Sequence, residues 1–279
     1  MKFLFIISSF IVLFISCTKE PNADFNASKM TAKIDEIIIF TNVSTDASKY
    51  KWNFGDNIEV FTDNTEHKYN QFGTYNVELT AYSENKKKED IKIISIIIQG
   101  PVYDYFTDNR DGYTYKTIKI GNQWWLAENI QYKPTYGNYW YQNNDVNNIP
   151  IYGYLYDYET SKTVVPEGWH IPNLNEWKQM LDYLGHQSTV GANLKEIGTE
   201  HWRETNSNVN NSSGFTALPG GQYFDGTFYY VEASGRWIIA KSDESDSLSI
   251  VSMHASTPSV DIYNNVSDEA GFSIRCIKD

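Results

Sequence analysis

The spacing of apolar residues predicts one amphipathic helix in a chain otherwise built from short strands. Four large apolar residues recur at helical spacing: Leu174, Trp177, Leu181 and Leu184. Asn173 and Glu176 have the spacing of a capping box, and Gly185 stands where a left-handed cap would end the helix. We therefore expect a helix over 174–184 that buries one apolar face.

The N-terminal third of the chain has the alternation of β-strands. Short apolar runs are separated by turn residues such as Gly55-Asp56-Asn57. The strands expected here are 34–40, 50–54, 74–82 and 91–98. Several short strands without a helix signal predict an all-β, immunoglobulin-like sandwich over 24–99.

Gly100-Pro101 ends this pattern, so we place a linker at 100–102 and a second domain at 103–279. An alternating strand at 113–120 and the helix at 174–184 predict a helix-poor α+β fold for it. Residues 101–279 hold 12 Lys/Arg against 22 Asp/Glu, and the whole chain has a net charge of −12. This acidic balance argues against nucleic acid as a partner, because phosphates require a basic surface.

The first 17 residues have the form of an export signal. Lys2 precedes a mostly apolar run of 13 residues, Phe3 to Ile15, which is too short to span a bilayer as a helix. Ser16-Cys17 resembles a bacterial lipobox, which implies lipidation of Cys17 and a tether over 18–23. Thr18 implies outer-membrane retention, with the domains facing the periplasm or the cell surface. The alternative is a plain secretory signal with cleavage nearby.

The first domain resembles a PKD (polycystic kidney disease) domain. The residues that carry the resemblance are Trp52-Asn53-Phe54-Gly55-Asp56, His67-Lys68-Tyr69 and Gly73-Thr74-Tyr75-Asn76-Val77. It implies a sandwich that serves as a spacer or interaction module. Trp52 is then expected in the core and His67 in a structural hydrogen bond.

The second domain resembles the Fibrobacter succinogenes major paralogous (FISUMP) domain. The matching segments are 108–129, with Gln123-Trp124-Trp125-Leu126-Ala127-Glu128-Asn129, then 168–177, 214–221 and 271–279. The family is found in secreted or surface-anchored bacterial proteins, and no activity is firmly attached to it. A C-type-lectin-like architecture is a weaker, fold-level analogy. Cys276 has no second cysteine beyond Cys17 and is expected as a small buried residue.

The segment from Tyr132 to Tyr158 holds eight tyrosines and Trp140, with amide side chains between them. Aromatic rings cover the C–H faces of sugars, and amides and carboxylates bind hydroxyls. The candidate ligand-binding residues are Tyr136, Tyr139, Trp140, Tyr141, Asn143, Asn144 and Asp145. In an extended segment Tyr139 and Tyr141 share one face while Trp140 packs inward. The alternative is that the rings fill the core and the amides serve as turn residues.

No sequence signature of catalysis or metal binding is present. Asp108 and Asp111 lack the ligand spacing of a calcium loop, and Glu196 and Glu200 are ordinary in an acidic domain. We therefore expect no enzyme activity, no cofactor and no metal ion. The leading hypothesis is a cell-envelope lipoprotein that displays a non-catalytic binding domain, with polysaccharide as the ligand. The alternative is a protein-binding adhesin or assembly component, which a contiguous apolar patch would favour; an enzyme is the third reading.

Overall fold

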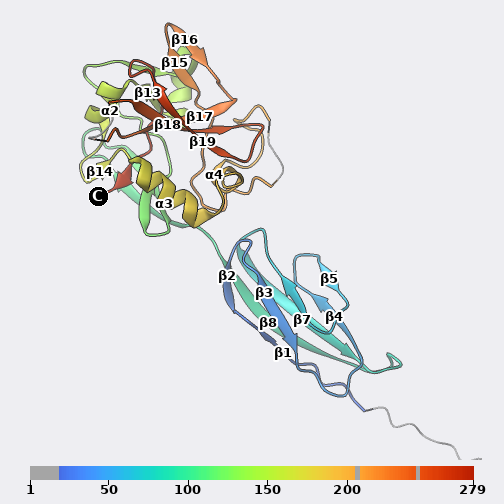
Figure 1. Cartoon of the computed structure of the whole chain (residues 1–279). Coiled ribbons are helices and arrows are strands. Elements are labelled where there is room, and N and C mark those ends of the chain that lie inside the picture. Colours follow the sequence, from blue (N-terminus) through green and yellow to red (C-terminus); the bar gives the residue numbers. More distant parts are fainter. Residues whose placement is uncertain (1–18, 205–207, 243–245) are drawn as a thin grey trace, which may run out of the picture. The chain divides into compact units, whose positions relative to one another are not determined.

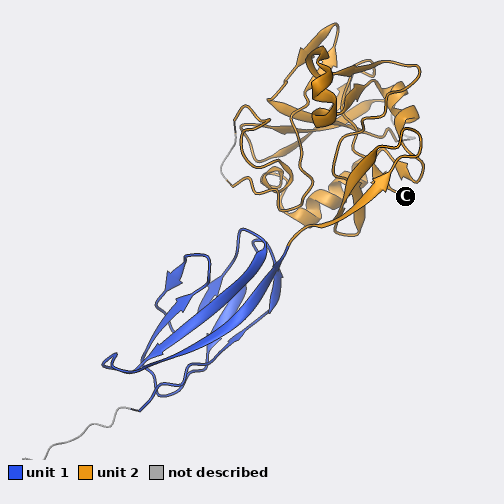
Figure 2. Cartoon of the chain, turned by 180° about the vertical axis from the view of Figure 1, so that it is seen from behind, with its two compact units in different colours: residues 1–99 blue, residues 100–279 orange. Residues whose placement is uncertain are grey.

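The computed structural model describes residues 19–204, 208–242 and 246–279. The expected export signal and Cys17 lie outside these residues. The chain divides into two compact units, residues 1–99 and 100–279 (Figure 2). None of the described helices is both long and apolar enough to cross a membrane.

The first unit is a β-sandwich of two sheets. One sheet has the order β1 (Phe25–Ala27), β3 (Ile38–Asn42), β6 (Thr65–His67). The other has the order β2 (Thr31–Lys33), β8 (Glu89–Gln99), β7 (Gly73–Tyr82), β4 (Lys49–Asn53), β5 (Glu59–Val60). Only β2 and β8 pair in parallel among these strands. The predicted two-domain fold with an all-β first domain is confirmed.

Aromatic rings fill the space between these two sheets. Trp52 is fully buried, and its ring centroid lies 5.0 Å from Phe25 and 5.9 Å from Phe40. His67 stacks on Phe54 at 4.1 Å and bonds the Asp56 carboxylate at 2.7 Å. Both side chains therefore have the structural roles that the sequence predicts.

Two boundaries of this unit differ from expectation. The strand expected from residue 34 begins at Ile38, because Asp35 adopts a left-handed conformation (φ 61°) within a turn. The tether expected over 18–23 is partly inside the sandwich, since Ala23 is buried and Asn22 exchanges backbone hydrogen bonds with Thr45 at 3.0 Å. The Asp35-Glu36 pair that interrupts the apolar residues of 34–40 marks this turn in the sequence, whereas the pairing of Asn22 is a tertiary contact.

The second unit is mostly β, with a few short helices (Figure 1). Its five-stranded sheet has the order β14 (Trp169–His170), β20 (Ile277–Lys278), β11 (Gln123–Leu126), β10 (Thr114–Ile120), β9 (Val102–Thr107). Its three-stranded sheet has the order β17 (Ser234–Ile239), β18 (Leu248–His254), β19 (Val260–Val266). Strand β9 thus begins inside the expected linker.

Two hairpins and six short helical segments complete this unit. The hairpins are β12 (Tyr139–Tyr141) with β13 (Tyr154–Tyr156), and β15 (Gln222–Phe224) with β16 (Thr227–Tyr229). The helices are η1 (Gln142–Asn144), η2 (Val146–Asn148), α1 (Ile149–Tyr152), α2 (Tyr158–Val164), α3 (Leu174–Leu184) and α4 (Gly191–Leu194). The expected helix-poor domain is confirmed.

Helix α3 has the predicted bounds. The Asn173 side chain accepts hydrogen bonds from the backbone N–H of Asn175 (2.9 Å) and Glu176 (3.1 Å). In return, Glu176 Oε2 accepts from the Asn173 N–H at 2.8 Å, which completes the capping box. Gly185 ends the helix at φ 131°, ψ −157°, which is a positive-φ extended conformation rather than the left-handed helical one that we expected. A glycine suits this conformation as well, because no Cβ opposes it.

Three of the segments that carry the family resemblance meet inside the second unit. Asn129 Oδ1 accepts hydrogen bonds from Arg275 Nε (2.8 Å) and Trp237 Nε1 (2.9 Å). The remaining Arg275 nitrogens donate to the backbone carbonyls of Leu126, Phe215 and Thr216. Burial lowers the pKa of Arg275 to about 9. These motif residues therefore hold the core together, and they are not available to a ligand.

The three-stranded sheet separates two apolar cores. On one face Trp237 and Val251 pack with Trp177 of α3, which is fully buried. On the other face Ile238 and Ile250 pack in a core rich in tyrosine, which also holds the buried thiol of Cys276. Tyr115, Tyr154, Tyr156 and Tyr158 are buried in this second core. Part of the tyrosine-rich segment is therefore scaffold, as the alternative interpretation predicted.

Candidate functional site

Strand β12 sends its aromatic rings to two sides. The rings of Tyr139 and Tyr141 both meet the ring of Tyr154 edge-on, at 5.4 Å and 6.1 Å between centroids. Trp140 points the other way and stacks on Tyr223 at 4.3 Å with an interplanar angle of 20°. The rings alternate as predicted, but with the faces exchanged: Tyr139 and Tyr141 pack against the tyrosine-rich core, whereas Trp140, which was expected to pack inward, stacks on Tyr223. All three rings stay partly exposed.

The polar residues after β12 form a tight turn. Asn143 and Asn144 are exposed and take left-handed conformations (φ 54° and 56°), which asparagine tolerates better than most residues. Asp145 Oδ1 accepts hydrogen bonds from the backbone and side-chain nitrogens of Asn147, at 3.0 Å and 2.8 Å. Tyr136 lies in the preceding bend and is 73% exposed. Asp145 thus caps η2, whereas the amides of Asn143 and Asn144 remain at the surface.

Sequence reasoning missed the hairpin β15–β16, which lies near the top of Figure 1. Asp225 and Gly226 form its turn, both with positive φ (48° and 79°). An Asp-Gly pair between alternating aromatic residues is a strong hairpin signal, and it could have been read from the sequence. Tyr223 and Phe228 are directly opposed across the two strands, with their centroids 5.1 Å apart.

The hairpin carries two groups of aromatic rings. Tyr223 and Phe228 continue the stack that Trp140 begins. Tyr229 and Tyr230 lie beside each other at 6.3 Å, and the guanidinium of Arg236 lies over Tyr230. Adjacent residues of a strand point to opposite faces, so Trp140, Tyr223 and Phe228 stack on one face of the hairpin, and Gln222 and Tyr229 lie on the other. We call the hairpin surface the residues gathered on this second face: Gln222, Tyr229, Tyr230, Arg236 and Tyr263.

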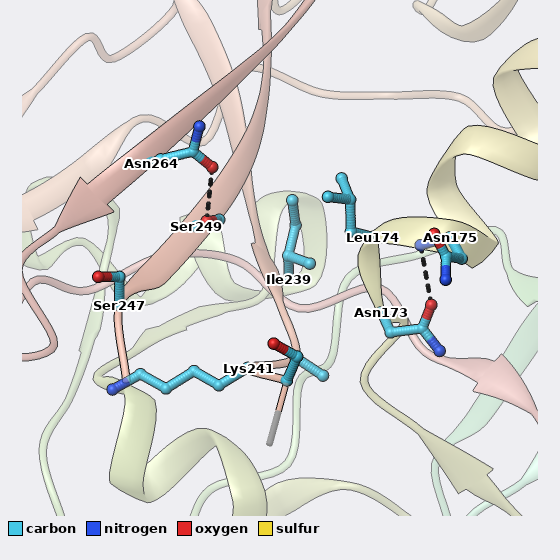
Figure 3. A pocket seen from close by; sticks show the side chains of 10 residues that line it. Asn173, Leu174, Asn175, Ile239, Lys241, Ser247, Ser249 and Asn264 are labelled. Atoms are coloured by element: carbon cyan, nitrogen blue, oxygen red, sulfur yellow. Dashed lines mark hydrogen bonds between the residues drawn. The ribbon is translucent and has the colours of Figure 1, made fainter. Parts of the chain in front are cut away.

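A polar pocket with a volume of about 550 Å³ opens beside the N-terminus of α3 (Figure 3). It is lined by Asn173, Leu174, Asn175, Ile239, Ala240, Lys241, Ser242, Ser247, Ser249 and Asn264. The Ser249 hydroxyl donates to Asn264 Oδ1 at 2.8 Å, as the dashed line in Figure 3 marks. Lys241 is the one titratable residue among the described residues that line it, and its ammonium binds Asp268 at 2.6 Å. The described lining offers hydroxyls and amides.

A second pocket of about 590 Å³ lies between α2 and the segment 165–171. His170 lines it and joins two carboxylates: Nε2 bonds Glu176 at 2.8 Å and Nδ1 bonds Asp279 at 2.7 Å. Burial alone would lower the pKa of His170, but the hydrogen bonds to Asp279 and Glu176 raise it. His170 thus ties β14 to α3 and to Asp279, which is a structural role.

One group among the described residues has the side-chain types and spacing to hold a metal ion. The potential ligand atoms of Glu196, Glu200 and His201 lie within 4.8 Å of one another. His201 Nδ1 already bonds both oxygens of Glu196, at 2.8 Å and 3.0 Å. Asp108, the hint of a calcium loop in the sequence, is buried and holds Arg110 through both carboxylate oxygens. The segment from Asp108 to Gly112 is therefore a turn and not a calcium loop.

Comparison with known proteins identifies both units. Residues 118–278 match the model of the Fibrobacter succinogenes major domain, and residues 18–97 match that of the PKD domain. None of the curated proteins matches the chain. Among solved structures, one described as the basis for promiscuous specificity of carbohydrate-binding modules from the β-sandwich superfamily is 15% identical. The alignment covers 94% of this chain and 92% of that one, with a TM-score of 0.30, which is too low to support an argument about ligand.

Proposed function

Because the chain belongs to the Fibrobacter succinogenes major domain family and carries a PKD domain ahead of that domain, we propose that it is a non-catalytic cell-envelope lipoprotein that binds polysaccharide. In this proposal Cys17 is the lipidated anchor and the PKD domain is the spacer. The outer membrane is the proposed location, with the domains facing the periplasm or the cell surface. The second domain is the binding module.

The hairpin surface carries the proposal of polysaccharide binding. Tyr229, Tyr230 and Tyr263 are 42%, 48% and 41% exposed, although water contact with large aromatic faces is unfavourable. Exposed aromatic rings gathered in one place are typical of a binding site. Gln222 lies opposite Tyr229 in the hairpin and accepts a hydrogen bond from Arg236. Asn143 and Asn144 follow Trp140 in the chain. Flat rings beside amides are the combination that sugar faces and hydroxyls require.

The hairpin that carries this surface is held from its opposite face before any ligand arrives. Trp140 stacks on Tyr223 and lies so close to Gly271 that a Cβ there would come within 2.5 Å of the indole. Tyr139 and Tyr141 support the same strand from the opposite side through Tyr154. Fixed rings lose little conformational entropy on binding, which favours affinity. The segment from Tyr136 to Asp145 thus belongs to the proposed site partly as ligand contacts and partly as support.

The absence of catalysis in the proposal is supported by how the titratable groups are used. In the pocket of Figure 3 the ammonium of Lys241 is bound to Asp268. In the second pocket His170 is held between Glu176 and Asp279. A general base must reach a proton of the substrate. Lys241 and His170 are instead bonded to carboxylates of the protein.

The test is retention of the full-length chain on a panel of immobilised polysaccharides, with matched ring deletions. Tyr229→Ala should weaken binding by roughly 1–3 kcal/mol, the scale of burying one large side chain, and leave the melting temperature unchanged. Tyr105→Ala is the control, because Tyr105 is 68% exposed on β9, outside the hairpin surface. Equal retention of both variants would overturn the proposed site, and no retention of the parent would overturn the function.

Protein binding is the second candidate, and one observation favours it. Ile91, Ile93 and Ile97 project from the outward face of β8 in the PKD domain, each about half exposed. Such a row of apolar residues is typical of a protein contact. The measurement is cross-linking of the anchored protein to neighbouring envelope proteins before and after Ile93→Thr. A specific cross-link that Ile93→Thr abolishes, with no polysaccharide retained, would favour this alternative.

A further inference from the structure

Arg236 occupies the centre of the hairpin surface. It lies in β17, opposite Ser252 of β18, while its neighbour Trp237 points into the apolar core. Its guanidinium carbon lies 3.9 Å from the ring centroid of Tyr230 and 5.7 Å from that of Tyr263. Its Nη1 donates a hydrogen bond to the neutral side chain of Gln222. The guanidinium is thus half-buried between two exposed tyrosines.

The charge of this guanidinium has no carboxylate partner. No carboxylate oxygen within residues 19–204, 208–242 and 246–279 forms an ion pair with Arg236. Its Nε is buried and has no hydrogen-bond acceptor. By contrast, Arg110 of the same unit binds Asp108 through two nitrogens. An unpaired, partly desolvated cation is unfavourable, so an incoming anion would be bound with little competition.

Arg236 is a positive charge in a domain that is acidic as a whole. Burial lowers the pKa of the nearby His254, and the charges of Arg236, Lys195 and Arg203 lower it further. Asp261 opposes this shift. Residues 101–279 nevertheless have an excess of ten acidic residues. The guanidinium is therefore a positive charge within an acidic domain, and it favours a negatively charged ligand.

The backbone around Tyr230 is strained in a way that places its ring. Tyr230 and Glu232 both have positive φ, at 59° and 60°, which costs about 1–2 kcal/mol for a residue with a side chain. Gly221 allows the hairpin to close, because a Cβ there would lie 2.4 Å from the carbonyl oxygen of Tyr229. Strain of this kind persists where a side chain must be held in one position, and such positions cluster at binding sites.

We propose that the ligand of the hairpin surface is an acidic polysaccharide, whose uronic-acid carboxylate binds the guanidinium of Arg236. This inference rests on the polysaccharide binding proposed above. The planar, positively charged guanidinium matches a carboxylate in shape and charge. Tyr229 and Tyr263 then cover the C–H face of the sugar ring. A neutral polysaccharide would leave the charge of Arg236 uncompensated.

The experiment compares three probes on the full-length chain in EDTA. Polygalacturonate carries the carboxylate, its methyl ester has the same sugar backbone without the charge, and polyglutamate has the charge without the sugar. Polygalacturonate should bind about tenfold or more tightly than the methyl ester, the scale of a charge-assisted hydrogen bond. Arg236→Gln should remove this preference and keep the affinity for the methyl ester, which also reports an intact hairpin. Lys178→Gln, which removes an exposed positive charge on α3, is the control and should change nothing.

Each outcome decides the inference. Equal binding of polygalacturonate and its methyl ester would overturn the acidic ligand and leave the polysaccharide function standing. Binding of polyglutamate as tight as that of polygalacturonate would assign the surface to an acidic polypeptide instead. If Lys178→Gln lost the preference for polygalacturonate as Arg236→Gln does, the preference would be a non-specific attraction between charges. Failure of the parent to bind either form of polygalacturonate would overturn the acidic ligand, and the polysaccharide panel then decides the function separately.

Discussion

At the scale of residues, two buried tryptophans of the second domain differ in whether the indole N–H has a hydrogen-bond acceptor. Trp177 Nε1 is buried without a hydrogen-bond partner, whereas Trp202 Nε1 donates to the carbonyl oxygen of Ala217 at 3.2 Å. Trp177→Phe should therefore destabilise the domain by about 1 kcal/mol less than Trp202→Phe, since only the second loses a hydrogen bond. Urea unfolding of both variants measures the difference. A larger cost at Trp177 would mean that its N–H has a partner in solution.

His170 gives a prediction with a defined pH dependence. Its pKa is raised in the folded chain above the ordinary value of 6.5, because the hydrogen bonds to Asp279 and Glu176 outweigh burial. The stabilisation is therefore fully present below about pH 6.5 and is lost as the pH rises through the folded pKa. His170→Gln should lower the melting temperature by a few degrees at most at pH 5.5, because half-exposed ion pairs contribute about 0–1 kcal/mol. A deficit that stays constant from pH 5.5 to pH 9 would contradict this origin.

At the scale of elements, the closure of the hairpin β15–β16 depends on Gly221 more than on its turn glycine. Both Gly221 and Gly226 have positive φ, but only at Gly221 would a Cβ meet backbone atoms within 4 Å. Gly226→Ala should lower the free energy of unfolding by about 1 kcal/mol through its positive φ alone. Gly221→Ala should lower it at least twice as much, because the backbone at residue 221 and that of Tyr229 must move apart. Limited proteolysis of the hairpin and polysaccharide retention would report the displacement. Equal behaviour of the two variants would show that the hairpin is not held at this point.

Local signals made some elements predictable, and tertiary contacts hid others. The helix over 174–184 follows from apolar spacing and a capping box, both of which act within a few residues. The turn at Asp35 was missed although the Asp35-Glu36 pair breaks the apolar residues there, because the run of isoleucines that follows dominated the prediction. The stack of Trp140 on Tyr223 joins residues far apart in the sequence, and so does the bond between Asn129 and Arg275. No periodicity predicts such contacts, so the sequence indicated half of the candidate site and missed the hairpin opposite it.

At the scale of the whole molecule, the proposed anchor predicts where the protein is found. If acyl chains on Cys17 alone hold the chain to the membrane, Cys17→Ala should move it to the soluble envelope fraction. Detergent phase partitioning of the parent and the variant measures the change. Partitioning of Cys17→Ala with the detergent, as for the parent, would contradict lipid anchoring.

The most direct test of the account is hydrogen exchange of the full-length chain with and without polygalacturonate. The binding surface proposed here predicts slower exchange at 222–236 and at 139–141, where the hairpin and Trp140 lie. The PKD domain should exchange at the same rate in both samples. Protection confined to the pocket residues 239–242 and 247–249, or to β8 of the PKD domain, would contradict the assignment of the hairpin as the binding site.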